Sequence, residues 1–177
     1  MSTPAQANGG VYFKAPVGFA GTGCAAGSVS VNNANSDTMT ILFGNYEAGA
    51  DSDSGRKRAS CNFAVPVRVP QGYQVSKMTA DWQGYATGKS QLKRKYFFAG
   101  QPFVPWLTTK FNSNYDDDFL KRDNLMHSTS TWSACGRDVN LRINSNIRAL
   151  RGDSTIGVGA LDLQNKVIFK LQWRRCH

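Results

Sequence analysis

The sequence predicts an all-β protein: an antiparallel β-sandwich, of jelly-roll or immunoglobulin-like type, that carries two disulfides. Gly, Ser, Thr and Asn are spread along all 177 residues, a composition that suits many short strands joined by turns. Helix formers are scarce, because Glu47 is the only glutamate and no long window keeps apolar positions at helical spacing. Several segments instead alternate apolar and polar residues, which is the period of a strand with one buried face.

The N-terminal part of the chain is expected to hold a leader and short strands. Residues 1–10 are small and polar, and we expect them to form a flexible leader before one β-sandwich domain over residues 11–177. Glycines interrupt the chain around Cys24. Three segments of extended character follow the leader: residues 11–17, 28–32 and 38–43.

The middle of the chain predicts a loop, an edge strand and a hairpin. Residues 49–60 are polar enough to form a solvated loop that ends at Cys61. In the strand that follows, Pro66 has no N–H to donate to a neighbour, so we expect this strand at a sheet edge. Residues 75–85 and 91–99 are expected to pair with each other as a hairpin through a short turn that contains glycine.

The C-terminal part contains the clearest strand. Residues 100–131 have weak periodicity, and we expect an extended strand with long loops there, one of which holds three consecutive aspartates. Residues 138–150 alternate between apolar residues and outward Asn or Arg, which is an unambiguous period of two. Residues 166–173 repeat this alternation, and Cys176 is expected to tie the end of the chain to the core.

The charge balance favours acidic partners. Lys and Arg number 21 against 12 acidic residues, so the net charge is +9. Such a balance attracts polyanions, among them acidic polysaccharide, anionic lipid and nucleic acid, although excess positive charge also simply aids solubility. No specific nucleic-acid partner is expected, because no recognition motif accompanies the charge and export would separate the protein from most nucleic acid.

The four cysteines indicate an oxidising compartment. They are widely separated and form no C-x-x-C pair, and only His127 and His177 could complete a metal site. Two disulfides therefore fit better than zinc, and export fits better than the alternative of an intracellular chain with four buried thiols. No apolar run approaches the length of a membrane span, so contact with a membrane surface is open but spanning is not expected. The N-terminus lacks the regions of a signal peptide, so we expect a removed signal peptide and an added Met1.

Four cysteine-centred segments are similar in order and spacing to those of a known family. These segments are residues 20–31, 56–61, 132–136 and 171–176. Two further motifs accompany them: Val69-Pro-Gln-Gly72 and the Gly84-Tyr85 that follows Trp82. Over nearly the whole chain beyond residue 10, the sequence resembles the small secreted fungal and bacterial proteins of domain-of-unknown-function family 4360. The sequence departs from the family pattern at Ala25, where proline is frequent, and in the basic run 93–95, which could alter ligand choice.

The resemblance implies export and a cysteine framework, and it implies no biochemical activity. The cysteines of this framework are Cys24, Cys61, Cys135 and Cys176. Of the three possible connectivities we favour the sequential one, Cys24 with Cys61 and Cys135 with Cys176, because each half of the chain would then be closed locally.

No catalytic or metal-binding constellation is identifiable, so a non-enzymatic protein without a cofactor is expected. Nothing fixes the spacing of the carboxylates that a glycosidase would need, namely those of Glu47, Asp116, Asp117, Asp118 and Asp123. His127 lies next to Ser128, and adjacent residues rarely form a catalytic triad. The triplet Asp116, Asp117 and Asp118 is a weak calcium candidate in an expected loop, without the alternation of an EF-hand. The tripeptide at 151–153 matches the integrin-recognition motif but reads more simply as a tight turn.

The candidate binding residues lie on the clearest strand and among the aromatics. Arg142, Asn144, Asn146 and Arg148 form one outward row that could hydrogen-bond sugar hydroxyls or acidic groups, although a solvated sheet face looks similar. Stacking platforms for sugars are expected from aromatic residues, foremost Tyr85 and Tyr96, with Trp106 and Tyr115 as further candidates.

The sequence therefore predicts a secreted, non-catalytic recognition module. Its expected partner is a glycan or a cell-surface polyanion, bound through loops and a basic sheet face. The alternatives are a secreted effector or inhibitor that binds a protein target, and a membrane-active toxin.

Overall fold

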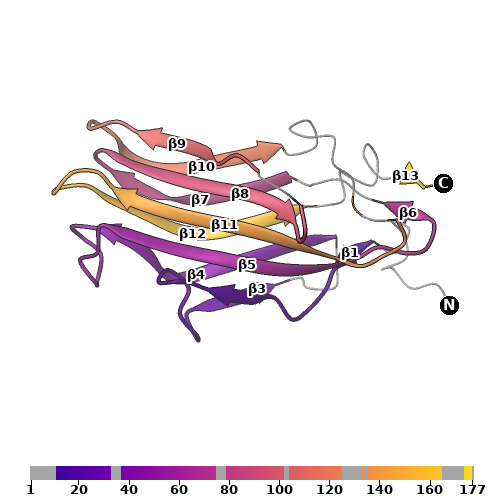
Figure 1. Ribbon diagram of the computed structural model, residues 1–177. Helices are drawn as coiled ribbons and strands as arrows, with labels where there is room; N and C mark the ends of the chain where they lie inside the picture. The colour runs from indigo at the N-terminus through magenta and orange to yellow at the C-terminus, as the bar shows by residue number, and fades with distance from the viewer. Residues whose placement is uncertain are drawn as a thin grey trace.

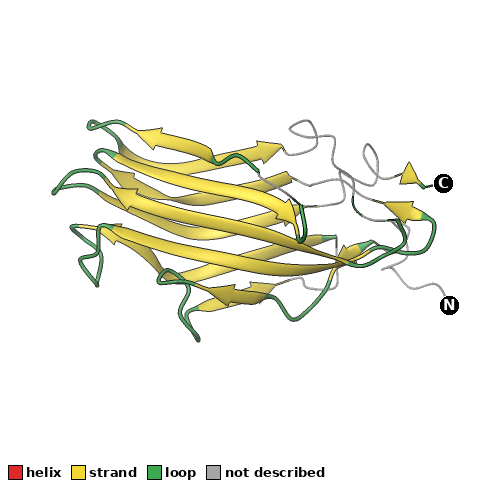
Figure 2. Ribbon diagram, in the orientation of Figure 1, coloured by secondary structure: helices red, strands yellow, loops and turns green. Residues whose placement is uncertain are grey.

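The computed structural model describes residues 11–32, 37–74, 79–101, 104–124, 133, 135–164 and 174–176. Over these residues the chain forms strands and turns without a helix, so the all-β prediction is confirmed (Figure 2). The described residues accordingly contain no helix that is long and apolar enough to cross a membrane. The expected leader, residues 1–10, lies outside the described residues, as does the strand expected at 166–173.

The strands form two antiparallel sheets that stack as the layers of a sandwich (Figure 1). We call them sheet A and sheet B. Sheet A contains β1 (Tyr12–Phe13), β2 (Gly18–Ala20), β5 (Arg58–Arg68), β8 (Ser90–Phe98), β9 (Leu107–Phe111) and β11 (Val139–Ala149). Sheet B contains β3 (Val29–Asn32), β4 (Thr38–Gly49), β7 (Thr79–Thr87), β10 (Asp116–Asn124) and β12 (Thr155–Gln164). A separate pair consists of β6 (Tyr73–Gln74) and β13 (Arg174–Arg175).

The strand order is that of a jelly roll. Sheet A runs β1-β5-β11-β8-β9, with β2 also paired to β5, and sheet B runs β10-β7-β12-β4-β3. Four of the crossings from one sheet to the other lie between β4 and β5, β7 and β8, β9 and β10, and β11 and β12. These four connections gather at one end of the sandwich, on the left of Figure 1. Of the two sandwich types that the sequence left open, the structure selects the jelly roll.

The hairpin predicted from residues 75–85 and 91–99 is wrong. Strand β7 pairs with β10 and β12, and β8 pairs with β9 and β11, so the short connection at Gly88 joins the two layers. The reason is that both strands direct their apolar residues into the same interior. The indole Nε1 of Trp82 on β7 donates to the hydroxyl of Tyr96 on β8 across the sandwich, at 2.6 Å.

The strand around Pro66 is also not at an edge, because β5 lies between β11 and the short strands β1 and β2. Pro66 occupies the gap between those two short strands, since β1 pairs with Val67 and Arg68 and β2 begins at Ala64. In that gap the N–H of Lys14 donates to the carbonyl of Pro66 at 2.7 Å. The missing N–H of proline therefore faces an interruption in the pairing, where no ladder bond is lost.

The interior is built mainly by alternation along the long strands, most regularly in β5, β8 and β11. Its largest fully buried apolar side chains include Trp82, Phe63, Phe13, Ile143 and Leu141. The sequential disulfides are confirmed as Cys24–Cys61 and Cys135–Cys176, with Cα atoms 5.6 Å and 5.9 Å apart. The first disulfide ties the segment after β2 to the buried side of β5.

One part of the interior is polar and fully hydrogen-bonded. Arg94 of β8 forms two hydrogen bonds to the carboxylate of Asp123 of β10, from Nε at 2.8 Å and from Nη2 at 2.7 Å. Both side chains are at most 4% exposed. The hydroxyl of Tyr96 donates to the same carboxylate at 2.5 Å, and Nη1 of Arg94 donates to Thr109 at 2.7 Å. This group joins the two sheets with directed hydrogen bonds, as does the buried pair of Tyr46 on β4 and Ser145 on β11, whose hydroxyl oxygens lie 2.9 Å apart.

Candidate functional site

The outer surface of sheet A carries positive charge without compensating carboxylates. Alternate residues of β5, β8, β9 and β11 point away from the interior. Seven of these outward residues are cations: Arg58, Arg68, Lys93, Lys95, Lys110, Arg142 and Arg148. None of the outward residues on these four described strands is Asp or Glu. We call this surface the basic face; it contains the predicted row on β11.

The register places like charges directly opposite one another on the basic face. Arg148 of β11 pairs with Arg58 of β5, and both are exposed. Side chains directly opposite across antiparallel strands have Cβ atoms only about 4.5–5.5 Å apart, and like charges there are destabilising. In the next row, Asn146 lies opposite Lys93 of β8. A pair of like charges at opposed positions therefore lowers stability when nothing compensates it.

A hollow of about 650 Å³ lies on the same face beside the N-terminal half of the outward row. Arg142 and Asn144 line it, together with Phe97 of β8. Its floor is made partly by the small residues Gly18 and Ala64, which pair across β2 and β5. The hollow therefore exposes backbone and aromatic surface between hydrogen-bond donors, which is an arrangement that can hold a flat polar ligand.

An aromatic residue borders the basic face. The ammonium group of Lys95 lies 4.8 Å from the centroid of the Trp106 ring and 5.7 Å from that of Phe97. Trp106 is 42% exposed. The cation over these rings is a favourable contact in itself, and it holds the ammonium group on the outer surface, one row from Arg142.

Tyr96, predicted as an exposed stacking platform, is instead buried with 2% exposure, so this prediction is wrong. Its pKa is raised well above the ordinary value, first because burial disfavours the phenolate and then because the Asp123 carboxylate lies beside it. The alternation of the sequence already indicated that Tyr96 is buried. Tyr96 is in phase with Leu92 and Phe98, which fixes it, along with Arg94, on the inward side of β8.

The acidic triplet was expected in a loop, but it opens strand β10. Alternation along the strand sends Asp116 and Asp118 to the outer surface of sheet B and Asp117 to the opposite side. The three carboxylates therefore do not converge on one point, as calcium coordination would require. No group of three His, Cys, Asp or Glu side chains with metal-binding geometry occurs in the part of the chain that the structure describes.

Tyr85, the other predicted platform, does lie on the surface and is 43% exposed. It belongs to the outer surface of sheet B, on the opposite side of the molecule from the predicted row on β11. Its hydroxyl donates to Asp116, and this hydrogen bond, with the charges of the neighbouring aspartates, raises the pKa of Tyr85 to about 12. The structure therefore places Tyr85 and the row on β11, which the sequence analysis assigned to one candidate binding site, on opposite surfaces of the molecule.

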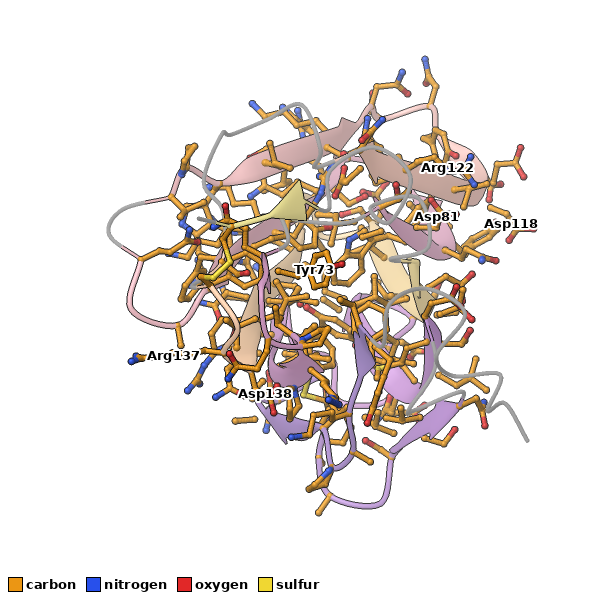
Figure 3. All side chains as sticks on the ribbon, turned by 90° about the vertical axis from the view of Figure 1, so that its right-hand side faces the viewer. Tyr73, Asp81, Asp118, Arg122, Arg137 and Asp138 are labelled. Carbon is orange, nitrogen blue, oxygen red and sulfur yellow. A yellow bond between two sulfur atoms is a disulfide. The ribbon has the colours of Figure 1, made fainter. Side chains whose placement is uncertain are left out.

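The outer surface of sheet B is acidic, and we call it the acidic face. Its outward carboxylates are those of Glu47, Asp81, Asp116, Asp118 and Asp162. Arg122 points outward among them and forms two hydrogen bonds with Asp81, each of 2.8 Å. Figure 3 shows Asp81, Arg122 and Asp118 on one side of the molecule, away from Arg137 and Asp138.

The remaining motifs are placed at the ends of the sandwich. The tripeptide at 151–153 forms an exposed turn after β11, in which the hydroxyl of Ser154 donates to the Arg151 carbonyl at 2.8 Å. At the other end, Asp138 accepts a hydrogen bond from Lys14 at 2.9 Å. Its pKa is lowered because the bonds from Lys14 and from the N–H of Val69 outweigh its partial burial. His127, Ser128 and His177 lie outside the described residues.

Comparisons with known proteins give one family and one relative. The sequence profile of the family described as "Domain of unknown function (DUF4360)" matches residues 15–176. A protein of Arthroderma benhamiae named "Uncharacterized secreted protein" is 31% identical over 171 residues, which cover 90% of this chain and 70% of the relative.

Two solved structures are similar at low scores. TmCBM61 in complex with beta-1,4-galactotriose has a TM-score of 0.39 and 9% identity, over 92% of this chain and 90% of that one. A family two carbohydrate esterase from Cellvibrio japonicus has a TM-score of 0.34 and 9% identity, over 92% of this chain and 36% of that one. Scores this low transfer neither a ligand nor an activity to this chain.

Proposed function

The chain belongs to the DUF4360 family and is a secreted, disulfide-bonded β-protein, and from that premise we propose that it is a non-catalytic domain that binds an anionic glycan across the basic face. The ligand would lie along β11 and its neighbours, with its acidic groups between the outward cations. The loops are not required for this mode of binding, although those that border the hollow would limit its extent.

The observation that carries the proposal is the juxtaposition of Arg58 and Arg148 on a surface without carboxylates. A folded protein gains no stability from opposing two guanidinium groups, and no acidic side chain on those strands relieves the repulsion. A carboxylate or sulfate group between them would accept charge-assisted hydrogen bonds from both. The separation from Arg148 to Arg142 along the strand is about 20 Å at the usual rise per residue, long enough for an extended oligosaccharide.

The amides and aromatics favour a glycan over other polyanions. Asn144 and Asn146 alternate with the arginines along β11, and an amide can both donate to and accept from a sugar hydroxyl. The hollow beside Phe97 has space for a ring that packs on an aromatic surface. Binding a polyanion through charge alone would require neither the amides nor the hollow.

Binding without catalysis is favoured by the state of the interior acid. Asp123 is fully engaged by Arg94 and Tyr96 and is buried, so it is not available to a substrate. The outward carboxylates of Glu47, Asp116 and Asp118 lie on the acidic face, on the other side of the sandwich from the bound anion.

The test is titration of the protein with soluble acidic polysaccharides (polygalacturonate, alginate and a sulfated glycan) and with neutral ones, at low and high salt. We expect saturable binding to at least one acidic glycan, with an affinity that falls as salt rises but remains measurable at physiological ionic strength. The double variant Arg58→Gln/Arg148→Gln should lose at least about 10-fold in affinity, the equivalent of about 1.4 kcal/mol.

A matched control removes the same amount of charge elsewhere. The double variant Lys89→Gln/Lys121→Gln changes two exposed cations that lie off the basic face. If both double variants weaken binding equally, attraction is set by net charge and the proposal is wrong. The protein would instead be directed to membranes if it bound vesicles of anionic lipid as tightly as acidic glycans, and if Arg58→Gln/Arg148→Gln weakened both interactions in parallel.

A further inference from the structure

A groove of about 480 Å³ crosses the acidic face on the opposite side of the sandwich. One side of it is formed by Tyr85 and Asp118, and the other by Glu47 and Asn45 of β4. Its floor is the outer surface of β12 between residues 157 and 160. The groove is separated from the basic face by the full thickness of both sheets.

The groove exists because β12 has almost no side chains there. Gly157 and Gly159 leave the backbone bare between Tyr85 and Glu47. The pairing of β12 with both neighbours also shifts between Val158 and Ala160. Against β7, Gly159 is one extra residue, so β12 bulges there, whereas against β4 it is residues 43–45 that lie opposite Gly159. Bulges are over-represented beside functional sites, because they redirect the chain locally.

The fold does not require glycine at residue 159. A Cβ atom there would lie 3.9 Å from the carbonyl oxygen of Gln83, at ordinary contact distance, and its φ is outside the left-handed region. By contrast, a Cβ on Gly84 would lie 2.0 Å from the Gly157 oxygen, so glycine there is structural. Glycine inside a strand weakens it, and where packing does not demand it, glycine marks a place where a ligand approaches the backbone.

The chemistry of the lining specifies the ligand. No Lys or Arg lines this groove, whereas Glu47 and Asp118 do, and neither carboxylate forms an ion pair within the described chain. An anionic ligand is therefore repelled, and a ligand that donates several hydrogen bonds is attracted. The Tyr85 ring offers a flat surface whose hydroxyl is held by Asp116 and stays protonated, since its pKa is about 12. Stacking on an aromatic ring combined with hydroxyl-to-carboxylate hydrogen bonds matches an uncharged sugar chain.

We propose that the groove on the acidic face is a second binding site, specific for a neutral polysaccharide, so that one domain joins a neutral glycan on sheet B to an anionic glycan on sheet A. The neutral site does not depend on the anionic one. With both occupied, the domain crosslinks two chemically different polysaccharides through opposite surfaces, and the affinity of a mixed matrix for the protein exceeds that of either glycan alone.

The experiment uses a pair of glycine variants, one on each face. Gly159→Val fills the groove, and Gly18→Val fills the hollow of the basic face, where a new Cβ would likewise meet only ordinary contacts, 3.8 Å from the Cβ of Ala64. Wild type and both variants are titrated with neutral glycans (soluble β-1,3-glucan, mannan, xyloglucan and chitohexaose) and with the acidic panel. Thermal unfolding checks the fold, and both variants should unfold at or above the wild-type temperature.

We expect saturable, salt-insensitive binding of at least one neutral glycan that Gly159→Val weakens at least about 10-fold and Gly18→Val leaves unchanged. Tyr85→Ala should reproduce the loss. The acidic glycans should show the reverse pattern. The inference is overturned if a correctly folded Gly159→Val or Tyr85→Ala protein binds neutral glycans as wild type does, or if no neutral glycan binds at millimolar concentration. Loss of acidic binding alone in Gly18→Val would then leave the proposed function standing without the second site.

Discussion

The two outer faces of the sandwich have the same backbone plan and opposite chemistry. Each is the solvent side of a long antiparallel sheet, and each has a hollow whose floor contains small residues, Gly18 in one case and Gly159 in the other. The hollow of sheet A is bordered by Arg142, and the groove of sheet B by Glu47 and Asp118. The net charge of +9 therefore conceals two surfaces of opposite sign.

This contrast separates what folds the protein from what it can recognise. Along the long strands the buried inward residues are apolar, or are hydrogen-bonded like Arg94, because the interior excludes water. The outward residues are free of that constraint, so each face could acquire its own charge. Substitutions can test whether the faces are independent, and the largest effect is expected from a change that both faces share.

Arg94→Met should unfold the framework that both faces share. It leaves the Asp123 carboxylate buried without its partner, which typically costs about 3–5 kcal/mol. The double variant Arg94→Met/Asp123→Leu should be clearly more stable than Arg94→Met, because it leaves no unpaired charge. Chemical denaturation measures both, and glycan binding on the two faces should fall together. If Arg94→Met unfolded as wild type does, the polar group would not be what joins the sheets at this point.

Breaking the disulfide between Cys24 and Cys61 should damage the basic face more than the acidic one. The bridge closes 37 residues, and the chain-entropy estimate for such a loop is about 4 kcal/mol. It also holds the segment that follows β2 against β5. Gly18, the first residue of β2, lines the hollow of the basic face. We expect Cys24→Ser/Cys61→Ser to lower the unfolding temperature and to weaken acidic-glycan binding below that temperature, with the groove little changed. Cys135→Ser/Cys176→Ser, at the other disulfide, is the control.

The groove should keep its tyrosine protonated well into the alkaline range. The pKa of Tyr85 is about 12 in the folded protein, above the ordinary value of about 10. Because the folded pKa is raised, its contribution to stability is present below about pH 10 and is lost as pH rises through about 12. Tyrosinate absorbance should show a late transition that Tyr85→Phe removes and Asp116→Asn moves toward pH 10. A Tyr85 that ionises near pH 10 in wild type would contradict the hydrogen bond to Asp116.

The smallest effect is expected where the like charges oppose each other. Arg148→Gln removes the repulsion with Arg58 and should raise the free energy of unfolding by roughly 0.2–0.5 kcal/mol at low salt. Screening should abolish this gain in high salt. Denaturant titrations at two salt concentrations measure it, and Arg122→Gln on the acidic face, which removes a favourable pair with Asp81, should change stability in the opposite direction. A loss of stability in Arg148→Gln would mean that the two guanidinium groups are compensated, against the basis of the anionic site.

The sequence by itself determined the all-β class and the composition of single strand faces, and it favoured the sequential cysteine pairing without excluding the other two. Alternation along residues 138–150 predicted the outward row from Arg142 to Arg148, because a period of two assigns side chains to a face without reference to any other strand. The same rule, applied to β8, would have placed Tyr96 inside. The local pattern of apolar and polar residues thus predicts which side chains of one strand point inward and which point outward.

Only the tertiary structure decided which strands lie beside each other. The short connection at Gly88 suggested a hairpin, yet β7 and β8 belong to different sheets. The position of Arg58 opposite Arg148, the separation of Tyr85 from the outward row, and the groove at the bulge of β12 all follow from pairings distant in the chain. Strand pairing is a competition among all available edges for hydrogen bonds and buried area, so no single segment encodes its outcome.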